Sequence, residues 1–238
     1  MGDYIGYEHL PWIDAPIDPH SILIPLLPET PTILEAGCHD GADTIRFKQI
    51  WPNSTIIGFE PLPDKYSELQ TKLARTNSSN VKVMQKALSD HSGTITFFRS
   101  TSVPGASSLF PDNYKNVTIP DSVTPDPVVK QKIKDDGYKD TQITVECTTG
   151  DEELNKLGNP KIDMIWFDLE GGELVALQNT KAAVESAKVI MIEVNFIPFR
   201  YGMCHFDEIN KFLTDNGFTL KSLWGRSTWQ ADCLYVRG

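Results

Sequence analysis

The segment ILEAGCHDG, residues 33–41, changes character within nine residues. An apolar run of strand length carries Glu35 into a turn that begins at Gly37 and ends at Gly41. Residues 43–51 follow with the spacing of an amphipathic helix. Because glycines let the backbone approach a ligand and let a helix begin close to a sheet, we expect a strand, a ligand-binding turn and a helix here.

Strand-like and helix-like segments alternate from residue 32 to about residue 217. The expected strands are 32–37, 55–61, 81–88, 94–99, 142–148, 161–168 and 187–196, with a closing strand pair after residue 217. Helical patterns lie between most of them. This order predicts an α/β fold with a doubly wound Rossmann-like sheet, mostly parallel, with an antiparallel C-terminal edge strand.

Two regions stand apart from this alternation. Residues 1–30 are rich in proline, aspartate and aromatic residues, and we expect an N-terminal arm with a short helix near 19–27. Residues 31–238 are expected to form one domain. Residues 100–140 hold five prolines, and we interpret them as an insertion over the site, because long loops in compact domains are often functional.

Charge and composition limit the partners. The 238 residues carry 22 Lys and Arg against 32 Asp and Glu, so a basic face for nucleic acid is not expected. No apolar run is long enough for a membrane helix and the first residues do not form a signal peptide, which favours a cytoplasmic protein. The four cysteines form no CxxC pair, and no metal site is assigned. A small-molecule acceptor fits this charge, and the oligomeric state is not indicated.

The carboxyl ends of the expected strands carry the polar residues that could bind a ligand. In an open α/β sheet, ligands bind outside the carboxyl ends of the strands. Glu60 stands there, 19 residues after Gly41, where an acid can accept hydrogen bonds from both hydroxyls of a ribose. A nucleoside-bearing cofactor is therefore expected.

The first turn indicates which cofactor this is. A dinucleotide site needs G-x-G-x-x-G, but the second glycine is absent from GCHDG. Glu35 and Asp40 would repel a pyrophosphate, whereas they suit a ligand with a sulfonium and an ammonium group. These residues favour S-adenosylmethionine. Two alternatives remain open: a binding module for S-adenosylmethionine or a nucleotide without transfer activity, and an NAD-dependent oxidoreductase.

Several longer motifs carry a family resemblance. ILEAGCHDGADT with GFEP resembles the first two motifs of class I methyltransferases, and MIWFDLEGGELVALQNT at 164–180 resembles the signature of FkbM-type methyltransferases. QKALSDHSGTITF and VIMIEVN match that family's later strands, so the resemblance covers about residues 30–220. Trp166 departs from the pattern, because the family usually has a lysine there. The resemblance implies O-methylation of a hydroxyl on a sugar or another small natural product.

The resemblance also implies residue roles. The methionine portion of the cofactor would lie at Glu35, Gly37, His39 and Gly41, the ribose at Glu60, and the adenine near Pro61, Leu62 and Ala87. Asp168 would face the sulfonium, and the candidate bases are Asp168, Glu170, Glu193 and His205. Neighbouring carboxylates at the strand ends could share a proton or a divalent cation. Structural alternatives stay open: Glu35 as a partner of the following helix, His39 as a surface turn residue, and His205 as a polar residue at a helix N-terminus.

Overall fold

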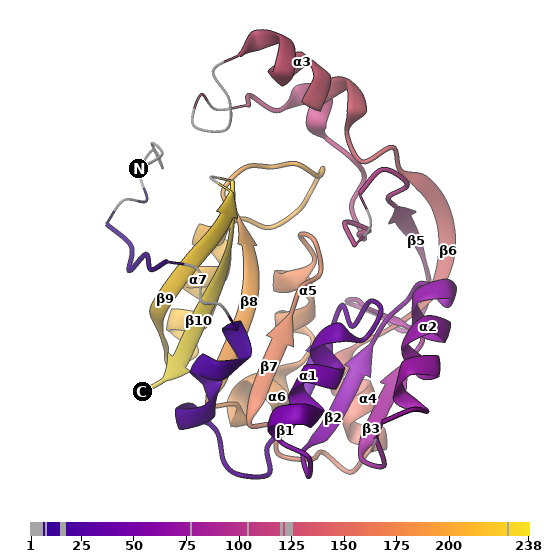
Figure 1. Ribbon diagram of the computed structural model, residues 1–238, viewed down its shortest axis with the longest axis vertical. Coiled ribbons are helices and arrows are strands. Elements are labelled where there is room, and N and C mark those ends of the chain that lie inside the picture. Colours follow the sequence, from indigo (N-terminus) through magenta and orange to yellow (C-terminus); the bar gives the residue numbers. More distant parts are fainter. Residues whose placement is uncertain are drawn as a thin grey trace.

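The main sheet has seven strands in the order β3-β2-β1-β7-β8-β10-β9 (Figure 1). The computed structural model describes residues 7, 9–14, 18–76, 78–103, 105–119, 121, 126–227 and 229–238, without the side chains of 226 and 227. The strands are β1 (Thr32–Ala36), β2 (Thr55–Phe59), β3 (Val81–Met84), β7 (Met164–Phe167), β8 (Val189–Asn195), β9 (Phe218–Ser227) and β10 (Gln230–Arg237). The first five are parallel and β10 runs antiparallel to both β8 and β9. The predicted fold class is confirmed.

Helices cover both faces of this sheet because apolar residues of each strand point alternately to either side. Ile33 packs with Phe47 and Leu23 on one face, and Leu34 packs with Leu177 on the other. The first face carries the 3-10 helix η1 (Pro19–Leu26) and the helices α1 (Ala42–Ile50) and α2 (Pro63–Leu73). The second carries α4 (Gly150–Lys156), α5 (Glu173–Gln178), α6 (Lys181–Ser186) and α7 (Phe206–Asp215).

A second sheet of three strands was not predicted. It has the order β4-β6-β5, formed by β4 (Ala87–Leu88), β6 (Thr141–Thr148) and β5 (Gly93–Arg99). The single strand expected at 81–88 is therefore two, because the chain leaves β3 after Met84 and β4 pairs with β6 instead. The β5–β6 ribbon rises from the main sheet and carries η2 (Tyr114–Asn116) and α3 (Pro127–Asp136), with α3 far from the main sheet in Figure 1.

Parts of the expected arm and insertion lie outside the described residues, namely 1–6, 8, 15–17, 104, 120 and 122–125. In the described part of the arm, Ile13 donates its backbone N–H to the carbonyl of Leu223 at 3.0 Å, so the arm runs beside β9. The structure has η1 where the sequence predicts a short helix. Within the described residues, no helix has both the length and the apolar character needed to cross a membrane.

Candidate functional site

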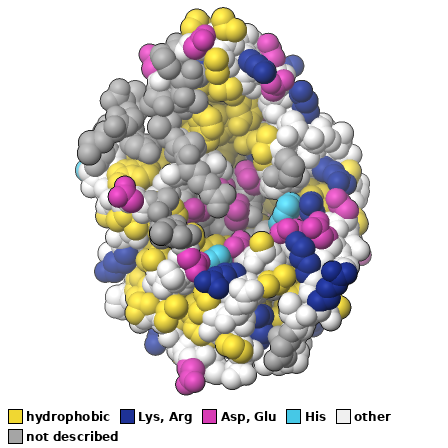
Figure 2. Space-filling model, viewed as in Figure 1, with side chains coloured by type: hydrophobic (Ala, Val, Ile, Leu, Met, Phe, Trp, Pro, Cys, Tyr) yellow, Lys and Arg dark blue, Asp and Glu magenta, His cyan; other side chains and the backbone are white. Residues whose placement is uncertain are grey.

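A cavity of about 390 Å³ opens at the carboxyl ends of β1, β2, β7 and β8. Figure 2 shows the hollow, with acidic side chains gathered on its lower wall and apolar side chains on its upper wall. The predicted residues that line it are Gly37, His39, Glu60, Pro61, Leu62, Ala87, Asp168 and Glu193. Three predicted residues, Glu35, Gly41 and His205, do not line it.

The turn after β1 is held open by backbone geometry that requires glycine. Gly37 has φ +86°, and a Cβ at this position would overlap the carbonyl oxygen of Asp168. His39 also has a positive φ, 46°, which is uncommon for a residue with a side chain. Its backbone N–H donates to Glu60 Oε2 at 2.8 Å, so the turns after β1 and β2 are tied together.

Glu60 is placed as an acceptor at the cavity wall. It is 4% exposed, and its second oxygen, Oε1, accepts from the backbone N–H of Leu62 at 2.8 Å. Each carboxylate oxygen has two lone pairs, so both can accept a further hydrogen bond from a ligand. Burial raises the pKa of Glu60 to about 7, against the two backbone donors that lower it.

Glu35 lies beneath the turn rather than on the cavity wall. It is 1% exposed, and its Oε2 accepts a hydrogen bond from Thr44 Oγ1 at 2.7 Å. Burial raises the pKa of Glu35 to about 8. The structure therefore does not support the direct ligand contact predicted for Glu35, and it favours the alternative of a partner to the following helix. Gly41 is likewise covered, because it packs against Leu69.

An acidic face closes the cavity at the ends of β7 and β8. One oxygen each of Asp168, Glu170 and Glu193 lie within 4.8 Å of one another. Burial, followed by the charges of Asp168 and Glu170, raises the pKa of Glu193 well above its ordinary value. Glu173 is fully buried and accepts from the backbone N–H of Leu169 at 2.8 Å, so it braces the turn that presents this face.

His205 is not part of the site. It caps α7, where its backbone N–H donates to Glu208 Oε2 at 3.0 Å. The sequence favoured histidine as a base because it titrates near neutral pH, but a helix N-terminus accounts for a polar residue at this position equally well. The structure therefore does not support the catalytic role predicted for His205.

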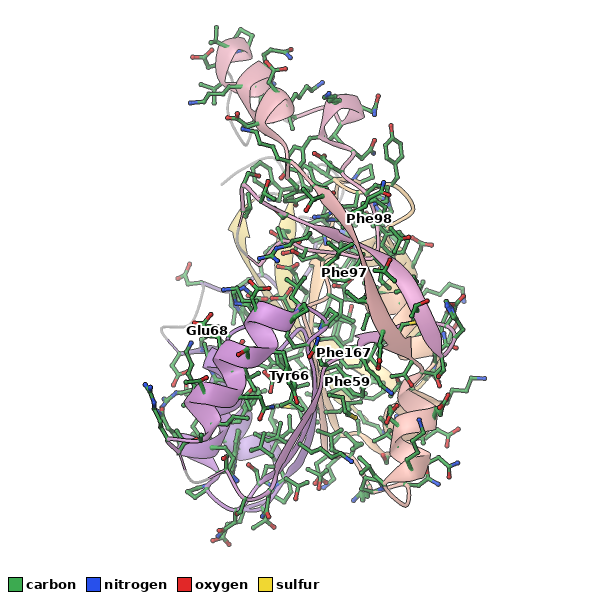
Figure 3. The ribbon with its side chains drawn as sticks, turned by 90° about the vertical axis from the view of Figure 1, so that its right-hand side faces the viewer. Phe59, Tyr66, Glu68, Phe97, Phe98 and Phe167 are labelled. Carbon is green, nitrogen blue, oxygen red and sulfur yellow. The ribbon has the colours of Figure 1, made fainter. Side chains whose placement is uncertain are left out.

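Further residues form the wall; Lys86 belongs to the strand-end turn that was expected near the adenine, whereas Phe97, Leu109 and Gln230 were not predicted. Lys86, Phe97, Leu109 and Gln230 line the cavity. Lys86 Nζ donates to Glu153 Oε1 at 2.8 Å, so its charge is already paired. Phe97 on β5 lies above the ends of β2 and β7, which Phe59 and Phe167 mark in Figure 3. The alternation of 94–99 could have indicated an inward Phe97, whereas no local pattern indicates Gln230, which arrives through the strand order.

The upper wall is formed by residues 103, 105–107 and 109, here called the lid segment, and a buried arginine helps to anchor it. Arg200 is 1% exposed and donates from Nη1 to Asp140 Oδ2 at 2.9 Å and to the carbonyl of Phe110 at 2.6 Å. Its Nη2 donates to the carbonyl of Ala106, and its guanidinium lies 4.1 Å from the ring centroid of Tyr138. Arg200 therefore ties both ends of the insertion to the loop after β8 and does not line the cavity.

Known proteins with similar sequences are methyltransferases. The 2-O-methyltransferase NoeI of Sinorhizobium fredii (strain NBRC 101917 / NGR234) is 27% identical over 175 residues, which are 73% of this chain and 68% of NoeI. The methyltransferase sdnD of Sordaria araneosa is 30% identical over 169 residues, 67% of this chain and 64% of sdnD. Each relative is thus matched over about two thirds of its own length.

Solved structures with low sequence identity share the fold. A methyltransferase FkbM from Methylobacillus flagellatus KT superposes with a TM-score of 0.55 at 12% identity, covering 87% of this chain and 44% of that one. An rRNA methylase from Streptococcus thermophilus gives 0.50 at 12% identity over 94% of this chain and 99% of its own. The model of the methyltransferase FkbM domain matches residues 35–220. The chain therefore belongs to the FkbM methyltransferase family, which confirms the predicted enzyme class and its cofactor, S-adenosylmethionine.

Proposed function

We propose that this domain methylates a hydroxyl group on a sugar or another small natural product. The observation that carries the proposal is one continuous cavity in which Glu60 stands at one end, Asp168 and Glu193 stand at the other, and apolar lid residues lie above them. NoeI, by its name a 2-O-methyltransferase, supports oxygen as the methylated atom.

The cavity wall suits a cationic nucleoside ligand. The acids Asp43, Glu60, Asp168, Glu170 and Glu193 line it, while the charge of Lys86 is paired with Glu153. Among the described lining residues, a pyrophosphate would meet these carboxylates without a free cation to offset them, whereas a sulfonium and an ammonium group would be attracted. The wall therefore fits S-adenosylmethionine better than a dinucleotide.

Different residues of the cavity would bind the ribose, the adenine and the methionine portion of the cofactor. Glu60 would accept hydrogen bonds from the ribose hydroxyls with the lone pairs that His39 and Leu62 leave free. The apolar side chains of Leu62 and Ala87 would flank the adenine. The open turn at Gly37 would receive the methionine portion. When bound, S-adenosylmethionine supplies a methyl group on its sulfonium, which an acceptor oxygen displaces in line.

The acceptor would lie between the lid segment and the acidic face. Phe97 and Leu109 offer an apolar wall to the body of the acceptor. Asp168 is an exposed carboxylate on the opposite wall, so we assign it as the base that takes the hydroxyl proton. Glu193, whose oxygen lies within 4.8 Å of an oxygen of Asp168, can share that proton. The enzyme's main task is to hold the acceptor oxygen about 3 Å from the methyl carbon.

Calorimetry tests the cofactor half of this proposal without an acceptor. S-adenosylhomocysteine should bind the wild-type chain, NAD should not, and Glu60→Gln should weaken S-adenosylhomocysteine about 30-fold, because a charge-assisted hydrogen bond is lost. Glu185→Gln, an exposed acid on α6, is the matched control and should bind like wild type. Unchanged affinity in Glu60→Gln would defeat the ribose assignment.

Methyl transfer to a panel of sugars, glycosides and natural-product alcohols tests the acceptor half. An active acceptor should lose at least about 100-fold in kcat with Asp168→Asn, which keeps the shape but cannot accept the proton. Full activity in that variant would exclude Asp168 as the base. Binding of S-adenosylhomocysteine with no transfer to any acceptor would favour a non-catalytic module.

A further inference from the structure

A second, smaller cavity of about 150 Å³ lies against the acidic face, under the N-terminal arm. We call it the annex. It shares Asp43, Asp168 and Glu193 with the cofactor cavity, and Asp232 and His20 complete its polar lining. Four carboxylates thus surround a space of this size, and the imidazole that meets them comes from η1.

His20 is fixed in an orientation that leaves one nitrogen facing the annex. It is 7% exposed, and its ring stacks on Trp166 with centroids 5.0 Å apart and planes 10° apart. Nδ1 lies 3.1 Å from Asp18 Oδ1. In the neutral tautomer whose Nδ1 donates to this carboxylate, Nε2 keeps a lone pair that can bind a cation. Such a carboxylate–histidine pair is the arrangement that orients metal-binding histidines.

In that tautomer Nε2 and the carboxylate beside it, from Asp43, are both acceptors. Asp43 Oδ1 lies 3.0 Å from Nε2, yet Nε2 forms no hydrogen bond within the described structure. Glu193 Oε2 is also without accessible surface and without a hydrogen bond there. A buried acceptor without a partner costs about 1–3 kcal/mol, and facing acceptors repel one another. A cation between them would remove both costs.

We propose that the annex binds one divalent metal cation of the Mg²⁺ or Mn²⁺ kind, with His20 Nε2 and Asp43 as its protein ligands. The volume equals that of about five waters at roughly 30 Å³ each, so a partly hydrated ion fits. Such ions keep several waters when one or two protein groups bind them. Those waters would reach Asp168, Glu193 and Asp232 across the annex.

The site would join two distant parts of the chain. His20 belongs to η1, and Asp43 belongs to the first turn of α1, directly after the turn that forms the cofactor cavity. The ion would therefore hold the arm against that turn. The inference does not rest on methyl transfer, because ion binding is measured without cofactor or acceptor.

Electron paramagnetic resonance with Mn²⁺ tests the site on the full chain after treatment with a chelator. Wild type should bind one equivalent, and the spectrum of the bound ion should show coupling to an imidazole nitrogen. His20→Gln should abolish that coupling and weaken Mn²⁺ at least 10-fold. Asp43→Asn, at a side chain that is 45% exposed, should weaken it similarly and does not depend on the tolerance of the buried His20 position.

Two further variants make the assignment specific. His91→Gln, at an exposed histidine paired with Asp90, should bind Mn²⁺ like wild type. Glu170→Gln removes a carboxylate that lines the cofactor cavity and not the annex, and it should leave the nitrogen coupling intact. The proposal is overturned if wild type binds no Mn²⁺, if His20→Gln and Asp43→Asn bind it unchanged, or if Glu170→Gln alone abolishes binding.

Discussion

The two walls of the cofactor cavity are stabilised in different ways. The sheet wall is formed by turns that directly follow parallel strands, and backbone N–H groups fix its acids: His39 and Leu62 hold Glu60, and Leu169 holds Glu173. The lid wall belongs to an insertion that side chains hold in place: the buried Arg200, together with Ser108 and Asn113, which donate to the carbonyls of Glu170 and Pro198. The comparison suggests that cofactor binding and acceptor binding can be perturbed separately.

Replacing Arg200 should have the largest effect on stability. Arg200→Met leaves Asp140 buried without its charge partner, and breaking a buried pair typically costs about 3–5 kcal/mol. Urea denaturation should show this loss. Arg99→Met is the control, because Arg99 pairs with Asp64 at the exposed surface, where such pairs contribute under about 1 kcal/mol. Equal losses in the two variants would contradict the anchoring role of Arg200.

Replacing Gly37 should destabilise the sheet wall, as measured by the same urea denaturation. In Gly37→Ala the new Cβ overlaps the carbonyl oxygen of Asp168, and the positive φ adds strain, so we expect a loss of about 3 kcal/mol. Gly105→Ala separates the two causes: Gly105 has φ +94° but no atom lies within 4 Å of its Cβ position. Its loss should stay near 1 kcal/mol in the same denaturation experiment. A Gly37→Ala variant no less stable than Gly105→Ala would argue against the close contact.

The raised pKa of Glu60, on the sheet wall, predicts that the free energy of unfolding depends on pH. Its folded-state pKa, about 7, lies above the ordinary value of 4.5, so the native state binds more protons between these values. The free energy of unfolding should therefore fall as pH rises from about 4.5 to 7, by about 2 kcal/mol from this group. Glu60→Gln should lack that part of the slope. Denaturation series from pH 4.5 to 8 should be run on both proteins. If the free energy of unfolding changed with pH equally in wild type and Glu60→Gln, the raised pKa of Glu60 would be contradicted.

A lid residue should give the smallest effect. Leu109→Ala removes apolar surface that would cover the acceptor, so the acceptor KM should rise about 5- to 10-fold, equivalent to about 1–1.4 kcal/mol. S-adenosylhomocysteine affinity should change less than the acceptor KM, because Leu109 packs on the Leu62 and Ala87 cluster from the lid side and does not replace either residue. Steady-state kinetics and calorimetry on the same preparation check both statements.

Residues that act where their own strand ends could be predicted from the sequence. The acids Glu60, Asp168 and Glu193 each follow an apolar run, and parallel strands bring such ends to one edge. The same rule misplaced Glu35, which lies within the turn motif but is turned inward to Thr44. A motif in sequence does not show which side of a turn a carboxylate faces.

Residues brought in from distant elements could not be predicted. Gln230 lines the cavity because β10 is inserted between β8 and β9, and strand order is not encoded locally. His20 reaches the annex from the arm through its stacking on Trp166. The second sheet was missed because β4 is two residues long, too short to show a period.

Titration of S-adenosylhomocysteine into Glu60→Gln and Arg200→Met side by side tests the separation of the two walls most directly. The measurement is made at a temperature at which circular dichroism shows both variants folded. We expect Glu60→Gln to weaken binding about 30-fold and Arg200→Met to remain within about threefold of wild type. A loss in Arg200→Met as large as that in Glu60→Gln would show that the lid and the cofactor wall form a single cooperative unit.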